Sequence, residues 1–206
     1  MIKINTTQRL CNIIDDRSVV SQEVADEVLL RVEQLMQLID RAMSNESGHG
    51  LKMVYALLDR TVAEVLAKSP PVSCKARCSS CCHDNVDISR AEGEYIIEYC
   101  REHNIEIDKS ALEEQLKVTA ADVRFSPKSA CVFLKDGLCS IYPIRPVTCR
   151  THFVVTPAAL CEKGRYQRSD VIYFVSYKFE MFISAFTTIH PVERMPTVLL
   201  TLLNNK

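Results

Sequence analysis

The sequence predicts a mainly α-helical protein with a small cysteine-rich metal module that contains a short β-hairpin. Three observations predict this fold class: apolar residues at helical spacing along most of the chain, a concentration of cysteines in its middle, and one hairpin signal between two of those cysteines. With 206 residues and 47% hydrophobic residues, the chain can bury a core without help from a metal. We expect a helical hairpin over 1–70, a cysteine-cluster metal-binding module with inserted helices over 71–165, and C-terminal helices that pack on the same core over 166–206.

Two amphipathic helices are predicted in the N-terminal part. Apolar residues recur every three or four positions from 19 to 43 and again from 51 to 66, which is typical of helices with one buried face. The polar stretch 44–50 contains two glycines and separates the two helices, so we expect an αα-hairpin. Its apolar faces either pack on each other and on the metal module or form a surface for dimerisation or for another protein.

Four further helices are predicted after the first cysteines. The segment Ser89–Glu92 has the spacing of a capping box, and an apolar-periodic stretch follows it. The segment Ser110–Glu113 repeats that spacing within a helix expected over 108–123. Apolar residues lie at helical spacing again over 171–186, and a last short helix is expected over 196–203.

Cysteines carry most of the functional information. The chain has ten, and four of them fall in one short stretch with gaps of two or three residues. A second group begins on the two arms of a hairpin that the dipeptide Asp136-Gly137 predicts. Thiolates are soft ligands that suit zinc and iron–sulfur clusters, and short gaps let one turn direct several sulfurs at one centre. In a reducing compartment, this usage favours metal ligands over a disulfide framework.

We therefore predict that eight cysteines chelate zinc, as two ions with four thiolates each, or an iron–sulfur cluster. Neighbouring side chains leave the backbone in different directions, so the adjacent cysteines of the first group can face different metals. Cys11 and Cys100 are left over, and Cys100 is expected in the core. The predicted ligands are Cys74, Cys78, Cys81, Cys82, Cys131, Cys139, Cys149 and Cys161.

Four other polar residues accompany these cysteines. His83 and His152 each follow a predicted ligand closely, so each either replaces a thiolate, donates a hydrogen bond to one, or plays no part. Two tetrathiolate sites close together would carry a large negative charge. Arg145 and Arg150 stand where they can compensate it, or they form ordinary surface ion pairs.

The pattern of cysteines resembles a known family. The order Cys74-x-x-x-Cys78-x-x-Cys81-Cys82, followed by Cys131, by Cys139-Ser-Ile-Tyr-Pro-Ile-Arg-Pro-Val-Thr-Cys149-Arg and by Cys161, is similar to the YkgJ-type CxxCxxCC cysteine-cluster family, a zinc- or iron-chelating domain. The similarity covers roughly residues 74–165 and implies chelation by all eight cysteines. The first gap has three residues where the family often has two, which leaves the partition of the ligands between sites open.

Two alternatives for function follow. Flagellin lysine N-methylases carry a similar domain, so the resemblance offers a protein lysine N-methyltransferase as the alternative to a metal-binding protein. The spacing Cys74-x-x-x-Cys78-x-x-Cys81 also matches a radical S-adenosylmethionine cluster, but a helix and Pro70-Pro71 precede it instead of an early strand. The sequence has no glycine-rich phosphate loop and no nucleophile elbow, so whether the protein is an enzyme stays open.

Charge and hydropathy restrict the expected partners. The formal net charge is −1, with 25 basic and 26 acidic residues, which gives no indication of nucleic-acid binding. No secretory signal or membrane-spanning stretch is recognised, so a cytoplasmic protein without membrane contact is expected. The remaining candidate partner is another protein bound through the helical surfaces, and the oligomeric state stays open.

Overall fold

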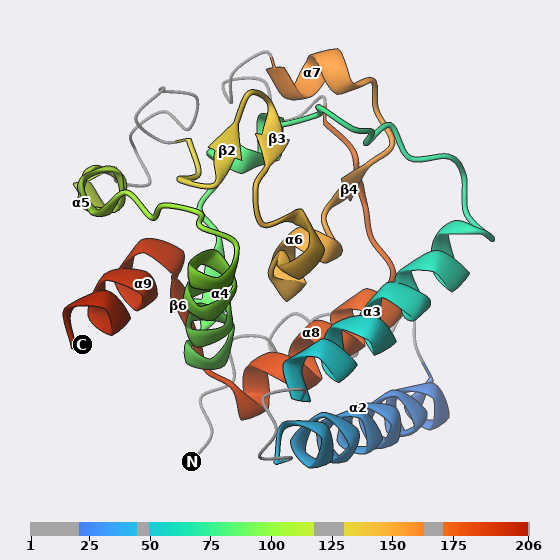
Figure 1. The fold of residues 1–206 in the computed structure, drawn as a ribbon. Helices are drawn as coiled ribbons and strands as arrows, with labels where there is room; N and C mark the ends of the chain where they lie inside the picture. Colours follow the sequence, from blue (N-terminus) through green and yellow to red (C-terminus); the bar gives the residue numbers. More distant parts are fainter. Residues whose placement is uncertain (1–20, 45–49, 118–129, 163–170, 206) are drawn as a thin grey trace. The chain divides into compact units, whose positions relative to one another are not determined.

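The computed structural model describes residues 21–44, 50–117, 130–162 and 171–205. The chain divides into two compact units, each built from two segments: a helical unit of residues 1–68 and 175–191, and a cysteine unit of residues 69–174 and 192–206. The described elements are α-helices, two short 3₁₀ helices and three two-stranded antiparallel pairs (Figure 1). The predicted fold class, mainly α with a short hairpin, is therefore confirmed.

The helical unit consists of α2 (Gln22–Met43), α3 (Gly50–Leu66) and α8 (Tyr177–Ile189), each packed against the other two. The amphipathic patterns of α2 and α3 thus form helices as predicted, and the segment 45–49 between them lies outside the described residues. The side chain of Ser21 caps α2 by accepting a hydrogen bond from the backbone N–H of Val24 at 3.5 Å. The core of this unit includes Ala25, Ile39, Leu51, Val54, Leu58, Phe179, Phe182 and Phe186.

The cysteine unit is organised on one antiparallel strand pair, and each of its strands leads into a helix. Strand β1 (Asp87–Ser89) pairs with β6 (Val192–Arg194), with Ile88 opposite Glu193. Helix α4 (Arg90–Glu102) follows β1, α9 (Met195–Asn204) follows β6, and the two helices pack against each other. The pair joins residues far apart in sequence, and we did not predict it from the sequence.

The predicted capping box at the start of α4 is confirmed. The Ser89 hydroxyl accepts from the Glu92 backbone N–H at 3.2 Å, and a Glu92 carboxylate oxygen accepts from the Ser89 backbone N–H at 2.8 Å. In the next helix, α5 (Lys109–Lys117), the predicted box at Ser110 is wrong. The cap there is Asp108, whose carboxylate accepts from the Ala111 N–H at 3.0 Å, because Ser110 already lies inside the helix. The expected extension of this helix to residue 123 lies outside the described residues.

The hairpin predicted by Asp136-Gly137 is confirmed. Strand β2 (Leu134–Lys135) pairs with β3 (Leu138–Cys139), and the two turn residues have φ angles of 52° and 75°. Positive φ at both central residues is the requirement of a type I′ turn, which an Asp-Gly pair meets at little cost. Short elements complete the unit: the 3₁₀ helices η1 (Ser80–His83) and η3 (Tyr142–Ile144), and the helices α6 (Val147–Arg150) and α7 (Ala158–Glu162).

The start predicted for the helix over 171–186 is wrong. Residues Tyr173–Phe174 form strand β5, which pairs antiparallel with β4 (Phe153–Val154), and α8 begins only at Tyr177. The stretch is rich in β-branched and aromatic residues, which favour a strand when a partner strand is available. The last predicted helix, by contrast, is confirmed as α9. In the part of the chain that the structure describes, no helix is long and apolar enough to cross a membrane.

The close packing of α4 and α9 depends on Gly93. A Cβ atom added there would lie 2.6 Å from Val198 Cγ1 and 2.9 Å from Leu202 Cδ1. We expect Gly93→Leu to lower the free energy of unfolding by about 3 kcal/mol, since overpacking of a core forces neighbouring elements apart. The matched control is Glu98→Leu on the exposed side of α4, with an expected change within about 0.5 kcal/mol. Equal denaturant midpoints for the two variants would contradict this account of the packing.

Candidate metal centre

The first group of cysteines lies on a tight turn followed by η1. The Cys78 N–H donates to the Lys75 carbonyl at 3.0 Å, and Arg77 within this turn has a φ of 67°. The Cys82 N–H donates to the Ser79 carbonyl at 2.9 Å, which continues the chain into the 3₁₀ helix. The four cysteines of this group therefore lie on one turn and the 3₁₀ helix that directly follows it.

Hydrogen bonds tie this turn to the second group of cysteines. The Cys131 N–H donates to the Cys82 carbonyl at 2.7 Å, and the Arg77 guanidinium donates to the Asp136 carbonyl at the hairpin tip at 3.3 Å. At the other end, the Ser73 N–H donates to the Val154 carbonyl at 2.8 Å. Helix α7, which carries Cys161, packs against η1. Residues far apart in the sequence therefore meet around the first cysteine turn.

Cys149 is placed by two buried charged residues. It lies on α6, the short helix that begins at Val147, whose N–H donates to the Glu92 carboxylate at 2.9 Å. Glu92, which is 1% exposed, therefore serves the starts of both α4 and α6. The side chain of Arg150, 2% exposed, donates to the Arg145 carbonyl at 2.7 Å and to the Pro143 carbonyl at 2.6 Å. Arg150 is thus a buried brace of the turn before Cys149 and not a surface ion-pair residue.

The thiols of the two groups interact electrostatically, and Cys81 is common to these interactions. The pKa of Cys81 is raised, first by its hydrogen bond with the adjacent Cys82 thiol and then by partial desolvation of the sulfur, although the residue as a whole is exposed. Burial also raises the pKa of four other thiols, and a charge on Cys81 raises each of them further. These four are Cys74, Cys131, Cys139 and Cys149. Thiols of the two groups therefore influence one another's ionisation.

Backbone N–H groups and one arginine lower the pKa values of some of these thiols, and so favour the thiolate form. Backbone hydrogen bonds from Val154, Phe133 and Ile141 lower the pKa values of Cys74, Cys131 and Cys139 respectively, although burial remains the larger effect at each. Arg145 lowers the pKa of Cys81 and of Cys139. Its guanidinium carbon lies 4.0 Å from the centroid of the Tyr142 ring, a cation–π contact that holds the charge in place.

The two histidines occupy different surroundings. His83 is the last residue of η1, directly after Cys82, and it is partly buried. The ring of His152 meets the edge of the Tyr173 ring, with the centroids 5.3 Å apart. Their roles at the metal therefore stay a prediction, and so does the complete ligand set of eight cysteines.

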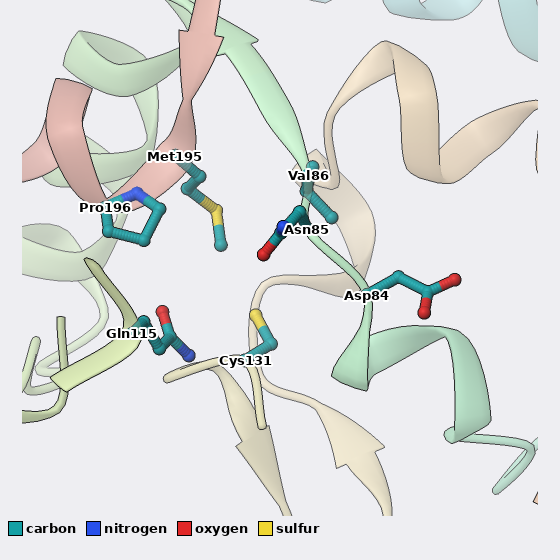
Figure 2. Close-up of a pocket in the computed structure, with 7 residues that line it drawn as sticks. All are labelled: Asp84, Asn85, Val86, Gln115, Cys131, Met195 and Pro196. Atoms are coloured by element: carbon teal, nitrogen blue, oxygen red, sulfur yellow. The ribbon is translucent and has the colours of Figure 1, made fainter. Parts of the chain in front are cut away.

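A water-sized cavity adjoins Cys131. It has a volume of about 20 Å³, and its lining includes Asn85, Gln115 and Met195. Figure 2 shows the Cys131 sulfur pointing into the cavity from one side and the Met195 side chain reaching into it from another. A cavity of this size accommodates one water molecule where polar groups surround it.

In the described ranges, no group of three or more His, Cys, Asp or Glu side chains is arranged so that it could hold a metal ion as it stands. The donor chemistry nevertheless fits a thiophilic metal, since the free cysteines of both groups meet in one region of the cysteine unit and backbone N–H groups are directed at three of the sulfurs. Hydrogen bonds to ligand sulfurs are a standard feature of zinc and iron–sulfur sites. Metal binding here would require side-chain rotations that bring the sulfurs closer together.

The sequence reasoning missed Gln115 and Tyr142. Gln115 is 7% exposed, and its side-chain amide donates to the Ala130 carbonyl, next to Cys131. Gln115 is one of several polar residues in an amphipathic helix, so the sequence does not indicate that it bonds to the main chain beside Cys131. Tyr142 belongs to the Cys-x-Ile-Tyr segment that identified the family, so a signal for it was present. The second contact of Glu92, to Val147, was also missed, because a capping box predicts only local bonds.

These features define a cysteine-cluster domain suited to chelating a soft metal. Residues 73–171 match the family model CxxCxxCC, whose description is "Putative zinc- or iron-chelating domain". The resemblance predicted from the sequence is therefore confirmed for this part of the chain. No curated protein and no solved structure matches the chain significantly.

Burial of the thiols leads to a testable pH dependence in the metal-free protein. Burial raises the pKa of Cys131 to about 12, and only the thiolate reacts with iodoacetamide. We expect slow labelling of Cys131 at pH 8 in the native protein and faster labelling as the pH approaches about 12, whereas the unfolded chain should react from about pH 8.5 upward. Peptide mass spectrometry measures this directly.

The raised pKa of Cys131 also makes the stability of the metal-free protein depend on pH. Because the folded state holds the Cys131 proton more tightly than the unfolded state does, the metal-free protein should lose stability as the pH rises from about 9 through about 12. Rapid labelling of native Cys131 at pH 8, or stability that rises over this pH range, would contradict the burial of its thiol.

Proposed function

We propose that this protein binds metal through the eight cysteines of the cysteine unit, as two zinc ions with four thiolates each or as an iron–sulfur cluster. The match of residues 73–171 to the chelating-domain family supports metal binding in general. The ligand set, the metal and the number of ions are the finer part of the proposal.

One observation carries the proposal: cysteines from segments distant in sequence interact with Cys81, and backbone N–H groups are directed at three of their sulfurs. Thiols buried only for packing would not need such donors, because a neutral S–H is a weak hydrogen-bonding group that packs as a small hydrophobe. The donors stabilise the thiolate, which is the form that binds metal.

The bound metal would supply the positive charge that the thiolates otherwise lack. Arg145, fixed on Tyr142, would balance part of the remaining negative charge, and Glu92 and Arg150 would keep α6 and Cys149 in position. The protein's own residues would thus orient the sulfurs. This arrangement suits a site that stabilises the fold of the cysteine unit or that holds a cluster for delivery or sensing.

The experiment that tests the proposal is metal analysis of protein purified without oxygen, combined with its visible absorption. Colourless protein with two zinc ions per chain would support the zinc form, since eight thiolates provide two tetrahedral sets. Brown protein that contains iron and acid-labile sulfide would support the cluster. Protein that takes up neither metal, even after reconstitution, would refute the proposal.

Substitutions separate ligands from other cysteines. Replacing Cys149 or Cys78 with Ser removes a soft thiolate and leaves a poorly matched hydroxyl, so the metal content should fall sharply. The matched control is Cys100→Ala. Cys100 lies in α4 and is 2% exposed, so its loss should cost about 1 kcal/mol of stability and leave the metal content unchanged.

The adjacent pair gives the sharpest result. If Cys82→Ser keeps the full metal content, Cys82 is not a ligand and the set of eight thiolates is wrong; His83 or His152 would then be tested as the replacement.

The methyltransferase alternative remains a prediction from the resemblance, and no observation on the described residues favours it.

A further inference from the structure

The sulfur of Cys131 is not held by packing on all sides. It faces the cavity of about 20 Å³, and no protein atom fills that space (Figure 2). A side chain beside a void lacks contacts on that side and can change rotamer without a clash. A backbone N–H of Phe133 bonds to this sulfur, but the position from which the sulfur can turn is set by the main chain of Cys131.

The peptide group between Ala130 and Cys131 is held from both ends. Its N–H donates to the Cys82 carbonyl at 2.7 Å, and its carbonyl accepts from the side-chain amide of Gln115. A peptide group is planar, so fixing both its N–H and its C=O fixes the orientation of the whole unit. The Cα of Cys131, and with it the origin of the Cys131 side chain, is thereby placed relative to Cys82.

Gln115 is itself anchored. Its backbone carbonyl lies in the last turn of α5, where carbonyls have no partner within the helix, and it accepts from the Arg194 guanidinium at 2.8 Å. The same Arg194 nitrogen donates to the side-chain oxygen of Asn85 at 3.2 Å. A positive charge at the C-terminal end of a helix is also favoured by the helix dipole. The chain of bonds runs from Asn85 through Arg194 and Gln115 to Cys131 and Cys82.

We propose that Gln115 is a positioning residue of the metal centre, anchored by Arg194: its amide fixes the main chain of Cys131 relative to Cys82, so that the Cys131 sulfur can reach the metal by rotation about its Cα–Cβ bond alone. This inference rests on the proposed function, since it assigns Cys131 as a ligand. Gln115 touches the backbone next to Cys131 and is not itself a metal ligand.

The test is Gln115→Met, which keeps the size of the side chain and the backbone carbonyl for Arg194 but removes the donor to Ala130. We expect metal affinity, measured by competition with a chromophoric chelator, to fall about 10- to 100-fold, the usual effect of removing a residue that orients a ligand. Cobalt-substituted protein provides a second readout. Its sulfur-to-cobalt charge-transfer absorption should lose intensity equivalent to one thiolate, which a general loss of stability would not produce.

Two further variants keep the test decisive. Lys117→Met lies on the same helix, where the exposed Lys117 ammonium pairs with the Glu114 carboxylate at 2.6 Å, and it should leave affinity and spectrum unchanged. Arg194→Met removes the contacts to Gln115 and Asn85 but leaves the Gln115 amide in place, so it should give a smaller loss than Gln115→Met. If Gln115→Met fails to fold, Arg194→Met carries the test.

The possible outcomes separate this inference from the proposed function. If the wild-type protein binds no metal, the proposed function fails. If the wild-type protein binds metal and Gln115→Met shows the same affinity and the same cobalt spectrum, the proposed function stands and the positioning role of Gln115 is refuted. A fall in affinity with an unchanged charge-transfer intensity would also refute it, because Cys131 would still be bound.

Discussion

Negative charge confined to a small volume is the constraint on which the cysteine unit depends. A charge on Cys81 opposes ionisation of Cys74, Cys131, Cys139 and Cys149, and burial opposes it further. Backbone N–H groups directed at three sulfurs, and the Arg145 guanidinium packed on the Tyr142 ring, favour the thiolate form. These donors weaken the effect of burial without cancelling it. In the proposed site, the bound metal would supply the remaining positive charge.

The elements that follow from local rules were predictable. The Ser89–Glu92 box and the Asp136-Gly137 turn each depend on residues a few positions apart, and both occur as expected. The strand pairs β1–β6 and β4–β5 were not predicted, because two or three residues give no periodic signal and their partners are distant in sequence. The same limit explains the late start of α8: the partner of β5 is not visible from residues 171–175 alone.

The site shows the same division. The match to the chelating-domain family could be predicted from the spacing of the cysteines along the chain. Their meeting around Cys81 depends on single long-range bonds, such as that from Cys131 to Cys82, which have no sequence signature. Arg150 illustrates the difference: its position in the motif was evident, but its role as a buried brace for backbone carbonyls came only from the structure.

The two ends of the segment 69–174, which joins α3 to α8, both lie beside strand β4. Ser73 at its start bonds to Val154 and Val155 of the β4 region, and β5 near its exit pairs with the same strand. For α8 to pack on α2 and α3, the chain must close a loop of roughly 100 residues. Contacts that join the two ends of this loop at β4 would shorten the effective loop to about 10 residues and reduce the entropic cost of closure by about 2 kcal/mol. Cys74 adjoins this junction, so a metal that secured the junction early would make α8 a near neighbour of α3 along the effective chain and speed completion of the helical unit.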